Sequence, residues 1–201
     1  MKPLRVALTF DAEHPDRPTS PAVVDSILAT LDRQSVRATF FLQGRWVESE
    51  PATAARICAA GHLVGNHSFY HARMPLLSED GFVEDVREAA RVIRETCGLD
   101  PAPWFRCPFG AGADHSRTQW LLAGLGYRDV GWHVEVEDWE PRHTGDDLAR
   151  AVISKVEAHG DGAIVLLHSW PRSTGTGLGG MIGGLRQRGY DFVGVDELLD
   201  S

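Results

Sequence analysis

The 201-residue chain alternates between short apolar runs and longer amphipathic segments along nearly its whole length, and this alternation limits the folds open to it. Strands are predicted at seven apolar runs, at residues 4–10, 38–42, 63–66, 104–106, 127–134, 164–168 and 190–194. Helices are predicted between them, starting at Pro21 and then at residues 51–60, 78–96, 115–125, 144–159 and 178–188. Strands linked through helices pair in parallel by right-handed crossovers.

The sequence therefore predicts an α/β fold, and its length and its apolar fraction of 43% fit one domain over residues 1–201. We favour a TIM-like (β/α) barrel of parallel strands. It is shorter and less regular than the usual barrel, because there are seven strands and fewer residues than the ~250 typical of that fold. The alternative is a doubly wound open sheet.

Composition excludes several partners. The net charge of −8 and the lack of a basic stripe argue against nucleic acid. No apolar run could span a bilayer, and the first five residues enter an apolar strand with no long hydrophobic region or cleavage site, so we expect no membrane association and a cytoplasmic location. Three widely spaced cysteines, Cys58, Cys97 and Cys107, imply no disulfide framework and suit a reducing compartment, with Cys58 in the core of a helix. The oligomeric state stays open.

Polar side chains gather where the predicted strands end. These residues are Asp11, Glu13, His67, His71, Arg106, Glu135, Asp138 and His168. The carboxyl ends of parallel barrel strands share one face, which is where such enzymes keep their chemistry. Capping or surface ion pairing would explain any one of these residues, but not their repeated occurrence at the same end.

His67 and His71 are a candidate metal pair. On a helix or a tight helical turn, residues four apart lie on one face, so both imidazoles can reach one ion. Two histidines and one carboxylate leave open positions, the usual form of a hydrolytic zinc centre. The alternative is a pair of surface or capping histidines.

Two charged pairs can supply acid–base chemistry beside such a metal. Asp11 is a candidate general base, with Arg106 keeping it ionised. His168 is a candidate general acid, with Asp138 keeping it cationic until it donates its proton. A structural ion pair for Arg106 and a turn cap for Asp138 are the alternatives.

Five motifs resemble, in the same order, those of the polysaccharide deacetylase family, also called the NodB-homology domain or family 4 carbohydrate esterases. They are Thr9-Phe10-Asp11, His67-Ser68-x-x-His71, Arg106-x-Pro108-Phe109-Gly110, Asp138-Trp139 and Leu166-x-His168. The resemblance implies a distorted (β/α)7 barrel and a metal-dependent hydrolase that removes acetyl groups from N-acetylated sugars. It makes Asp11 the base, His168 the acid, and Arg106 and Asp138 their supports. Phe109, Trp139 and Leu166 resemble the apolar groups near the acetyl methyl.

The first motif departs from the family pattern. The usual members carry a second aspartate that binds the metal, and Ala12 stands in its place. In an extended segment residues i and i+2 point to one side, so Glu13 can converge with Asp11, and we predict Glu13 as the third ligand beside His67 and His71. The substitutes are His14 and Asp16. The expected ion is Zn²⁺ or another divalent metal such as Co²⁺ or Ni²⁺.

The substrate is less constrained than the chemistry. We expect a small or soluble amide, an N-acetylated sugar derivative, over a cell-wall polymer. A hydrolase of cyclic or formyl amides and a non-catalytic carbohydrate-binding relative are the alternatives. A non-catalytic binding module would not require both charged pairs, Asp11 with Arg106 and Asp138 with His168, so their presence favours an enzyme.

Two further features lie outside these motifs. The glycines of Gly175-x-Gly177-x-x-Gly180 are interpreted as a flexible loop. Four tryptophans could stack on a sugar ring, Trp46, Trp104, Trp132 and Trp170, with ordinary packing favoured for Trp104 and Trp132.

Overall fold

The computed structural model describes residues 3–14 and 20–199. These residues form two compact units. The first contains residues 3–10, 20–39 and 132–199, and the second contains residues 11–14 and 40–131. Strand β1 (Leu4–Ala12) runs from the first unit into the second. The prediction of one domain over residues 1–201 stays a prediction.

The first unit is built around β1. This strand pairs with β6 (Ala163–His168) and with β7 (Tyr190–Phe192). The β1–β7 ladder is parallel, with Leu4 opposite Tyr190 and Val6 opposite Phe192. Every residue of β6 is buried. A strand covered on both faces reads as a continuous apolar run, which is why the sequence pattern at 164–168 predicted it.

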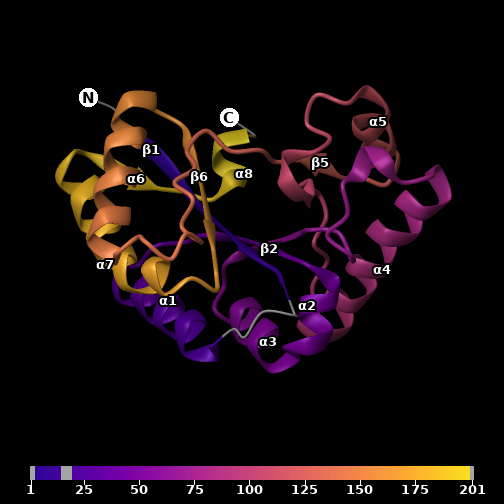
Figure 1. The fold of residues 1–201 in the computed structure, drawn as a ribbon, viewed down its shortest axis with the longest axis horizontal. Coiled ribbons are helices and arrows are strands. Elements are labelled where there is room, and N and C mark those ends of the chain that lie inside the picture. Colours follow the sequence, from indigo (N-terminus) through magenta and orange to yellow (C-terminus); the bar gives the residue numbers. More distant parts are fainter. Residues whose placement is uncertain (1–2, 15–19, 200–201) are drawn as a thin grey trace. The chain divides into compact units, whose positions relative to one another are not determined.

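Four helices belong to the first unit: α1 (Pro21–Arg33), α6 (Gly145–His159), α7 (Arg172–Gln187) and α8 (Val195–Leu199). Helix α7 packs against both α6 and α1 (Figure 1). A capping box starts α6, where the Thr144 side chain accepts from the Asp147 amide and the Asp147 carboxylate accepts from the Thr144 amide. Helix α6 therefore starts at a local signal in its own sequence.

The glycine motif was wrongly interpreted as a loop. All three glycines lie inside α7, which starts at Arg172 instead of residue 178. A Cβ added to Gly145 of α6 would lie 2.7 Å from the Gly177 nitrogen, and one added to Gly180 would lie 3.5 Å from the Ala149 Cβ. The glycines allow α6 and α7 to approach closely, and this packing outweighs their poor helix propensity.

The second unit contains the end of β1 and the strands β2 to β5. The strand order is β5-β4-β3-β2-β1, with β2 at Thr39–Leu42, β3 at Leu63–Asn66, β4 at Trp104–Phe105 and β5 at Arg128–Asp129. The pairs β3–β4 and β4–β5 are parallel. The expected strand 127–134 is wrong beyond Asp129. Val134 instead forms an isolated parallel bridge with Val165 within the first unit.

Helices α2 (Gly44–Ser49), α3 (Pro51–Ala59), α4 (Glu79–Cys97) and α5 (Ser116–Gly124) complete the second unit, with short 3₁₀ turns η1 (Met74–Leu76) and η2 (Pro108–Gly110). Helix α4 packs on α2 and α3 (Figure 1). It buries an apolar face that includes Phe82, Val86 and Ile93. All seven predicted strands occur, but α2 was missed. It has one and a half turns and starts at a glycine, so it has no helical periodicity to detect.

The cysteine interpretation is corrected. Cys58 and Cys97 form a disulfide between α3 and α4, with their Cα atoms 5.7 Å apart. The packing of the two helices brings together residues separated by 39 positions, which spacing alone could not reveal. Cys107 is a buried free thiol, and burial raises its pKa far above the usual range. The cytoplasmic location therefore stays a prediction without support from the cysteines.

Among the described helices, none has both the length and the apolar character needed to cross a bilayer.

Candidate active site

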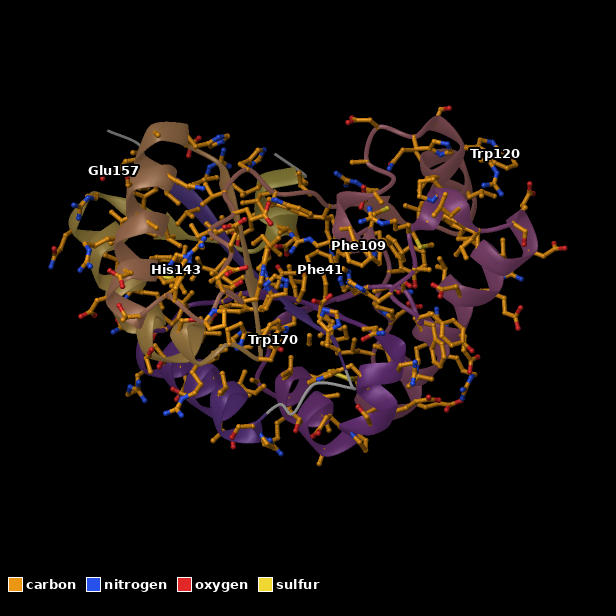
Figure 2. The ribbon with its side chains drawn as sticks, in the orientation of Figure 1. Phe41, Phe109, Trp120, His143, Glu157 and Trp170 are labelled. Atoms are coloured by element: carbon orange, nitrogen blue, oxygen red, sulfur yellow. A yellow bond between two sulfur atoms is a disulfide. The ribbon has the colours of Figure 1, made fainter. Side chains whose placement is uncertain are left out.

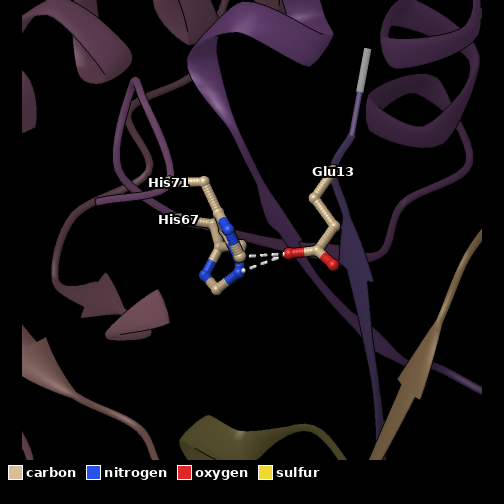
Figure 3. A group of neighbouring side chains, drawn as sticks. All are labelled: Glu13, His67 and His71. Atoms are coloured by element: carbon tan, nitrogen blue, oxygen red, sulfur yellow. Dashed lines mark hydrogen bonds and ion pairs between the residues drawn. The ribbon is translucent and has the colours of Figure 1, made fainter. Parts of the chain in front are cut away.

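Three side chains of the second unit converge on one point. The Glu13 carboxylate faces two imidazoles, with Oε2 3.2 Å from the His67 Nε2 and also in contact with the His71 Nε2 (Figure 3). One donor atom from each residue lies within 4.8 Å of the other two. Glu13 and His67 are at most 3% exposed. The structure therefore brings together the three residues predicted as metal ligands.

The end of β1 presents Asp11 and Glu13 to the same imidazole. The His67 Nε2 lies 3.6 Å from the Asp11 Oδ2 as well as 3.2 Å from the Glu13 Oε2. Ala12, between them, is fully buried. This is the convergence expected for residues i and i+2 of an extended segment. The Glu13 carboxylate thus reaches the histidine pair although position 12 carries no ligand.

The two histidines lie in a loop instead of a helical turn, which corrects the geometry expected from their spacing. The loop follows β3, and Ser68 and His71 have left-handed backbone angles, with φ of 66° and 58°. The imidazole centroids are nevertheless 4.9 Å apart. Left-handed backbone at residues other than glycine costs about 1–3 kcal/mol each and persists where surrounding contacts impose it.

The donor set fits a divalent metal. The His67 Nδ1–H donates to the Arg106 carbonyl at 2.9 Å, which leaves the Nε2 lone pair for a ligand. Two imidazole nitrogens and a carboxylate oxygen are donors that zinc and similar ions accept. Buried carboxylates that face imidazoles without a metal attract protons, and a cation would take the place of those protons.

The ionisation of the three residues reflects this competition. Burial opposes the charge of Glu13, but hydrogen bonds from His14, His67 and His71 outweigh it and hold its pKa well below the usual range. Burial also opposes a charged His67, yet Asp11 and Glu13 raise its pKa above the ordinary value. Burial lowers the pKa of His71, which therefore favours the neutral form that binds metals.

Asp11 is held by a buried arginine. The Arg106 Nη1 donates to the Asp11 Oδ1 at 2.8 Å, and both side chains are at most 5% exposed. The same guanidinium donates to the carbonyls of Val130 and Gly131 and lies 4.2 Å from the centre of the Phe41 ring. These contacts keep Arg106 in one orientation, so that the Asp11 carboxylate has a fixed cationic partner.

The first unit holds the other charged pair. The Asp138 Oδ1 lies 2.7 Å from the His168 Nδ1, and its Oδ2 accepts from the His168 amide at 2.7 Å and from the Thr174 hydroxyl at 2.6 Å. The Ser173 hydroxyl donates to the Asp138 carbonyl. Because Nδ1 is bound to the carboxylate, Nε2 is the nitrogen of His168 left to exchange a proton.

Comparison with known proteins is consistent with the motif pattern. The family model for polysaccharide deacetylases matches residues 1–130, well over half of the chain. The chain belongs to the polysaccharide deacetylase family. The peptidoglycan-N-acetylglucosamine deacetylase PgdA of Listeria monocytogenes is 34% identical over 195 residues, covering 96% of this chain and 38% of PgdA. The peptidoglycan-N-acetylmuramic acid deacetylase PdaA of Bacillus subtilis is 30% identical, covering 96% of this chain and 71% of PdaA.

Solved structures of the family have the same fold. A carbohydrate esterase family 4 pseudoenzyme from Bacillus anthracis, BA3943, matches with a TM-score of 0.86 and 31% identity, covering 99% of this chain and 66% of that one. A deacetylase called T48, solved with substrate, matches with a TM-score of 0.82 and 30% identity, covering 98% and 92%. The predicted fold class, a distorted (β/α)7 barrel, is confirmed. The chain spans well under half the length of the PgdA proteins it matches.

The apolar residues named by the family resemblance lie beside the two groups. The Trp139 ring centre is 5.0 Å from that of His168, and Leu166 precedes His168 by two residues on β6. Phe109, labelled in Figure 2, is 55% exposed, has a left-handed φ of 59°, and its ring centre is 4.5 Å from that of His71. Each of these residues is thus next to a proposed chemical group within its own unit.

Several other predictions changed. Trp46 and Trp104 are at most 5% exposed, so neither can stack on a sugar. The stacking suggested for Trp46 is therefore wrong, whereas Trp104 is packed as expected. Trp132 is half-buried, with its Nε1 donating to Glu135. The His14 Nε2 lies 2.7 Å from the Glu13 Oε1, beside the metal group. Asp16 lies outside the described residues.

Sequence reasoning missed three buried polar residues that contact the site. Gln43 accepts from the His14 amide, Asp85 accepts from the amides of Phe69 and Tyr70, and Thr174 donates to Asp138. The signal available was Asp85, a carboxylate on the apolar face of an otherwise regular amphipathic helix. Gln43 and Thr174 had no comparable pattern.

Proposed function

We propose that the chain is a metal-dependent hydrolase that removes acetyl groups from an N-acetylated sugar. The observation that carries the proposal is the buried group of Glu13, His67 and His71, which supplies the three protein ligands of an open catalytic centre despite the alanine at position 12. Zinc is the ion that this donor set suits, with Co²⁺ or Ni²⁺ as substitutes.

The relatives favour a class of substrate. PgdA and PdaA are named as deacetylases of N-acetylglucosamine and N-acetylmuramic acid in peptidoglycan. We therefore propose an acetamido sugar of the peptidoglycan type in preference to the small soluble amide expected from the sequence alone. The chain spans 38% of PgdA, so the substrate of the whole protein is part of the proposal.

Asp11 is the proposed general base. A divalent metal supplies Lewis acidity, which polarises a carbonyl oxygen and acidifies water. Asp11 accepts the proton of the attacking water through its carboxylate, and Arg106 at 2.8 Å keeps that carboxylate ionised and oriented. Arg106 acts only through Asp11, so its role is positioning.

His168 is the proposed general acid. Its Nε2 donates a proton to the departing amine, which otherwise is a poor leaving group. Asp138, 2.7 Å from Nδ1, stabilises the imidazolium before the transfer and fixes the ring. Phe109, Trp139 and Leu166 offer apolar surface for the acetyl methyl.

The test is acetate release from N-acetylated chitooligosaccharides and from isolated peptidoglycan, with the protein stripped by a chelator and then reloaded with zinc. We expect release that depends on the reloaded metal. Formylated and cyclic amides in the same assay test the alternative hydrolases. Metal-dependent release from those amides alone would replace the sugar substrate.

One observation favours a second candidate, a non-catalytic relative. The similar protein BA3943 is described as a pseudoenzyme, and a mutant of it as having restored activity. This chain departs from the usual first motif at Ala12. Zinc binding without release from any substrate would favour this candidate. Both buried charged pairs, Asp11–Arg106 and Asp138–His168, support the enzyme instead.

A further inference from the structure

We infer that Asp85 on α4 is the positioning residue that holds the loop of His67 and His71 in ligand geometry. The inference rests on the proposed metal site. Asp85 accepts from backbone amides between the two histidines, so it acts through the loop backbone.

Asp85 is placed where a helix normally carries an apolar residue. It is 4% exposed and lies among the buried residues of α4, which include Phe82, Val86 and Ala89. Within the described residues, no cationic side chain forms an ion pair with it. Burying a carboxylate in this way is costly unless its oxygens are well bonded. A leucine would suit the helix better, so the carboxylate serves some other need.

The two oxygens of Asp85 meet two successive amides of the loop. Oδ1 accepts from the Phe69 N–H at 3.0 Å, and Oδ2 accepts from the Tyr70 N–H at 3.0 Å. Phe69 and Tyr70 lie between the two histidines. The carboxylate therefore fixes the direction in which the chain turns from His67 to His71. Carboxylates bonded by two backbone amides form strong, charge-assisted contacts.

The same turn of α4 also holds the start of the loop. The Asn66 Nδ2 donates to the Val86 carbonyl at 2.9 Å, and the Asn66 Oδ1 accepts from the Ser68 amide at 2.8 Å. The Ser68 hydroxyl then accepts from the His71 amide at 3.0 Å. These contacts over-determine a backbone that is left-handed at Ser68 and His71, as a strained functional loop requires.

The Phe69 peptide is held from its other side as well. Its carbonyl accepts from the Arg45 amide at 3.2 Å and from the Gln43 Nε2 at 3.3 Å. The Gln43 Oε1 accepts from the His14 amide at 3.0 Å, one residue beyond Glu13. Gln43 thus links the segment of Glu13 to the loop of His67 and His71. Gln43 holds a carbonyl of that loop, and Asp85 holds two of its amides. Without Asp85 the loop can relax and carry the His71 ring away from Glu13.

The experiment compares Asp85→Asn with Glu84→Gln, a matched loss of one carboxylate at the exposed neighbouring position. An asparagine offers one acceptor and turns its NH₂ group toward the second amide. Zinc affinity is measured by competition with a chromogenic chelator, and ligand geometry by the visible absorption of the Co²⁺ form. We expect Asp85→Asn to bind zinc about 10- to 100-fold more weakly, the range for groups that orient metal ligands, with an altered Co²⁺ spectrum. Glu84→Gln should match the wild type in both.

Unchanged zinc affinity and Co²⁺ spectrum in folded Asp85→Asn would overturn the inference. If that variant does not fold, Asp85→Glu decides: it keeps both oxygens on a longer arm, so a shifted Co²⁺ spectrum supports the role and a wild-type spectrum overturns it. Glu13→Ala distinguishes a failure of the Asp85 positioning role from a failure of the proposed metal site. If Glu13→Ala weakens zinc binding while Asp85→Asn does not, only the positioning role fails. If neither variant weakens zinc binding, both the positioning role and the proposed metal site fail.

Discussion

The two polar groups differ in the kind of partner that each carboxylate meets. In the first unit, the Asp138 carboxylate accepts three hydrogen bonds, from the His168 ring, the His168 amide and the Thr174 hydroxyl. In the second unit, the Glu13 carboxylate meets the imidazoles of His14, His67 and His71, and the His71 ring lies edge-on to the other two rings. The Asp138 group therefore contains one imidazole beside a hydroxyl and an amide, whereas the Glu13 group gathers imidazole nitrogens and a carboxylate, the donors that a divalent cation accepts.

The backbone differs in degree between the two groups. Four residues around the Glu13 group, His14, Ser68, His71 and Phe109, have left-handed φ values between 58° and 66°. Beside the Asp138 group, Glu137 is left-handed, with φ of 48°, and His168 ends a regular six-residue strand. Strained loops that are fixed by many contacts are typical of sites prepared for a ligand. The comparison therefore supports the proposal that the second unit binds the metal and that His168 of the first unit donates the proton.

The largest expected effect separates chemistry from metal binding. Asp11→Asn and His168→Ala should each lower the turnover of acetate release by about 100-fold or more, the scale of a lost general base or acid. His168→Ala should leave zinc affinity within twofold of wild type. Steady-state kinetics and zinc titration measure both. Activity near that of the wild type in either variant would remove its assigned role.

Loss of the disulfide should affect one unit alone. Cys97→Ser should destabilise the second unit, which contains α3 and α4, by about 2–4 kcal/mol, the usual contribution of such a cross-link. Hydrogen exchange should rise in α4 and stay unchanged in α6 and α7. A thiol assay gives the control: denatured wild-type protein should show one reactive thiol, Cys107, before reduction and three after it. Three thiols before reduction would refute the disulfide.

The effect of pH should also separate the groups. Asp11 and Glu13 raise the pKa of His67 above its ordinary value of 6.5. Below that raised pKa, a proton on His67 competes with the metal. Zinc affinity should therefore fall with pH by up to about tenfold per unit below that pKa, for one displaced proton. In the metal-free protein, the pH dependence of folding stability has the opposite sign. Protonated His67 stabilises the fold at low pH, and this contribution is lost as pH rises through its raised pKa. Isothermal titration at pH 6 and 8 tests the first statement, and equal affinities would contradict it.

The smallest expected effect lies in the first unit. Thr174→Val removes one hydrogen bond to Asp138 at a fully buried position and nearly keeps the side-chain volume. We expect a loss of about 1 kcal/mol in the free energy of unfolding and no change in zinc affinity. Urea denaturation and zinc titration measure the two quantities. A weaker zinc affinity in Thr174→Val would show that the two groups are not independent.

The sequence predicted what repeats along the chain and missed what depends on packing. All seven strands could be located because buried parallel strands are continuous apolar runs. Helix α2 and the disulfide could not, because the helix is too short to show a period and the cysteines meet only when α3 packs on α4. The glycines of α7 were misread for the same reason, since their purpose is the close approach of Gly145.

The site could be predicted to a similar extent. Glu13, His67 and His71 were found from the order and spacing of motifs, although their loop was expected to be helical. Gln43 was not found, because its partners are a backbone amide and a backbone carbonyl, which carry no sequence signature. Asp85 had one signal, its place on the apolar face of α4, but that signal does not show which amides it binds. The expectation that all eight polar residues share one face stays a prediction.

The most direct test of the account is the zinc content of wild-type protein and of Glu13→Ala after chelation and reloading, measured by elemental analysis. The account predicts about one tightly bound ion per wild-type chain, as in an open catalytic centre, and a large loss in Glu13→Ala. A wild-type chain that binds no zinc, or a Glu13→Ala variant that binds it equally well, would contradict the claim that Glu13 takes the place of the missing aspartate at Ala12.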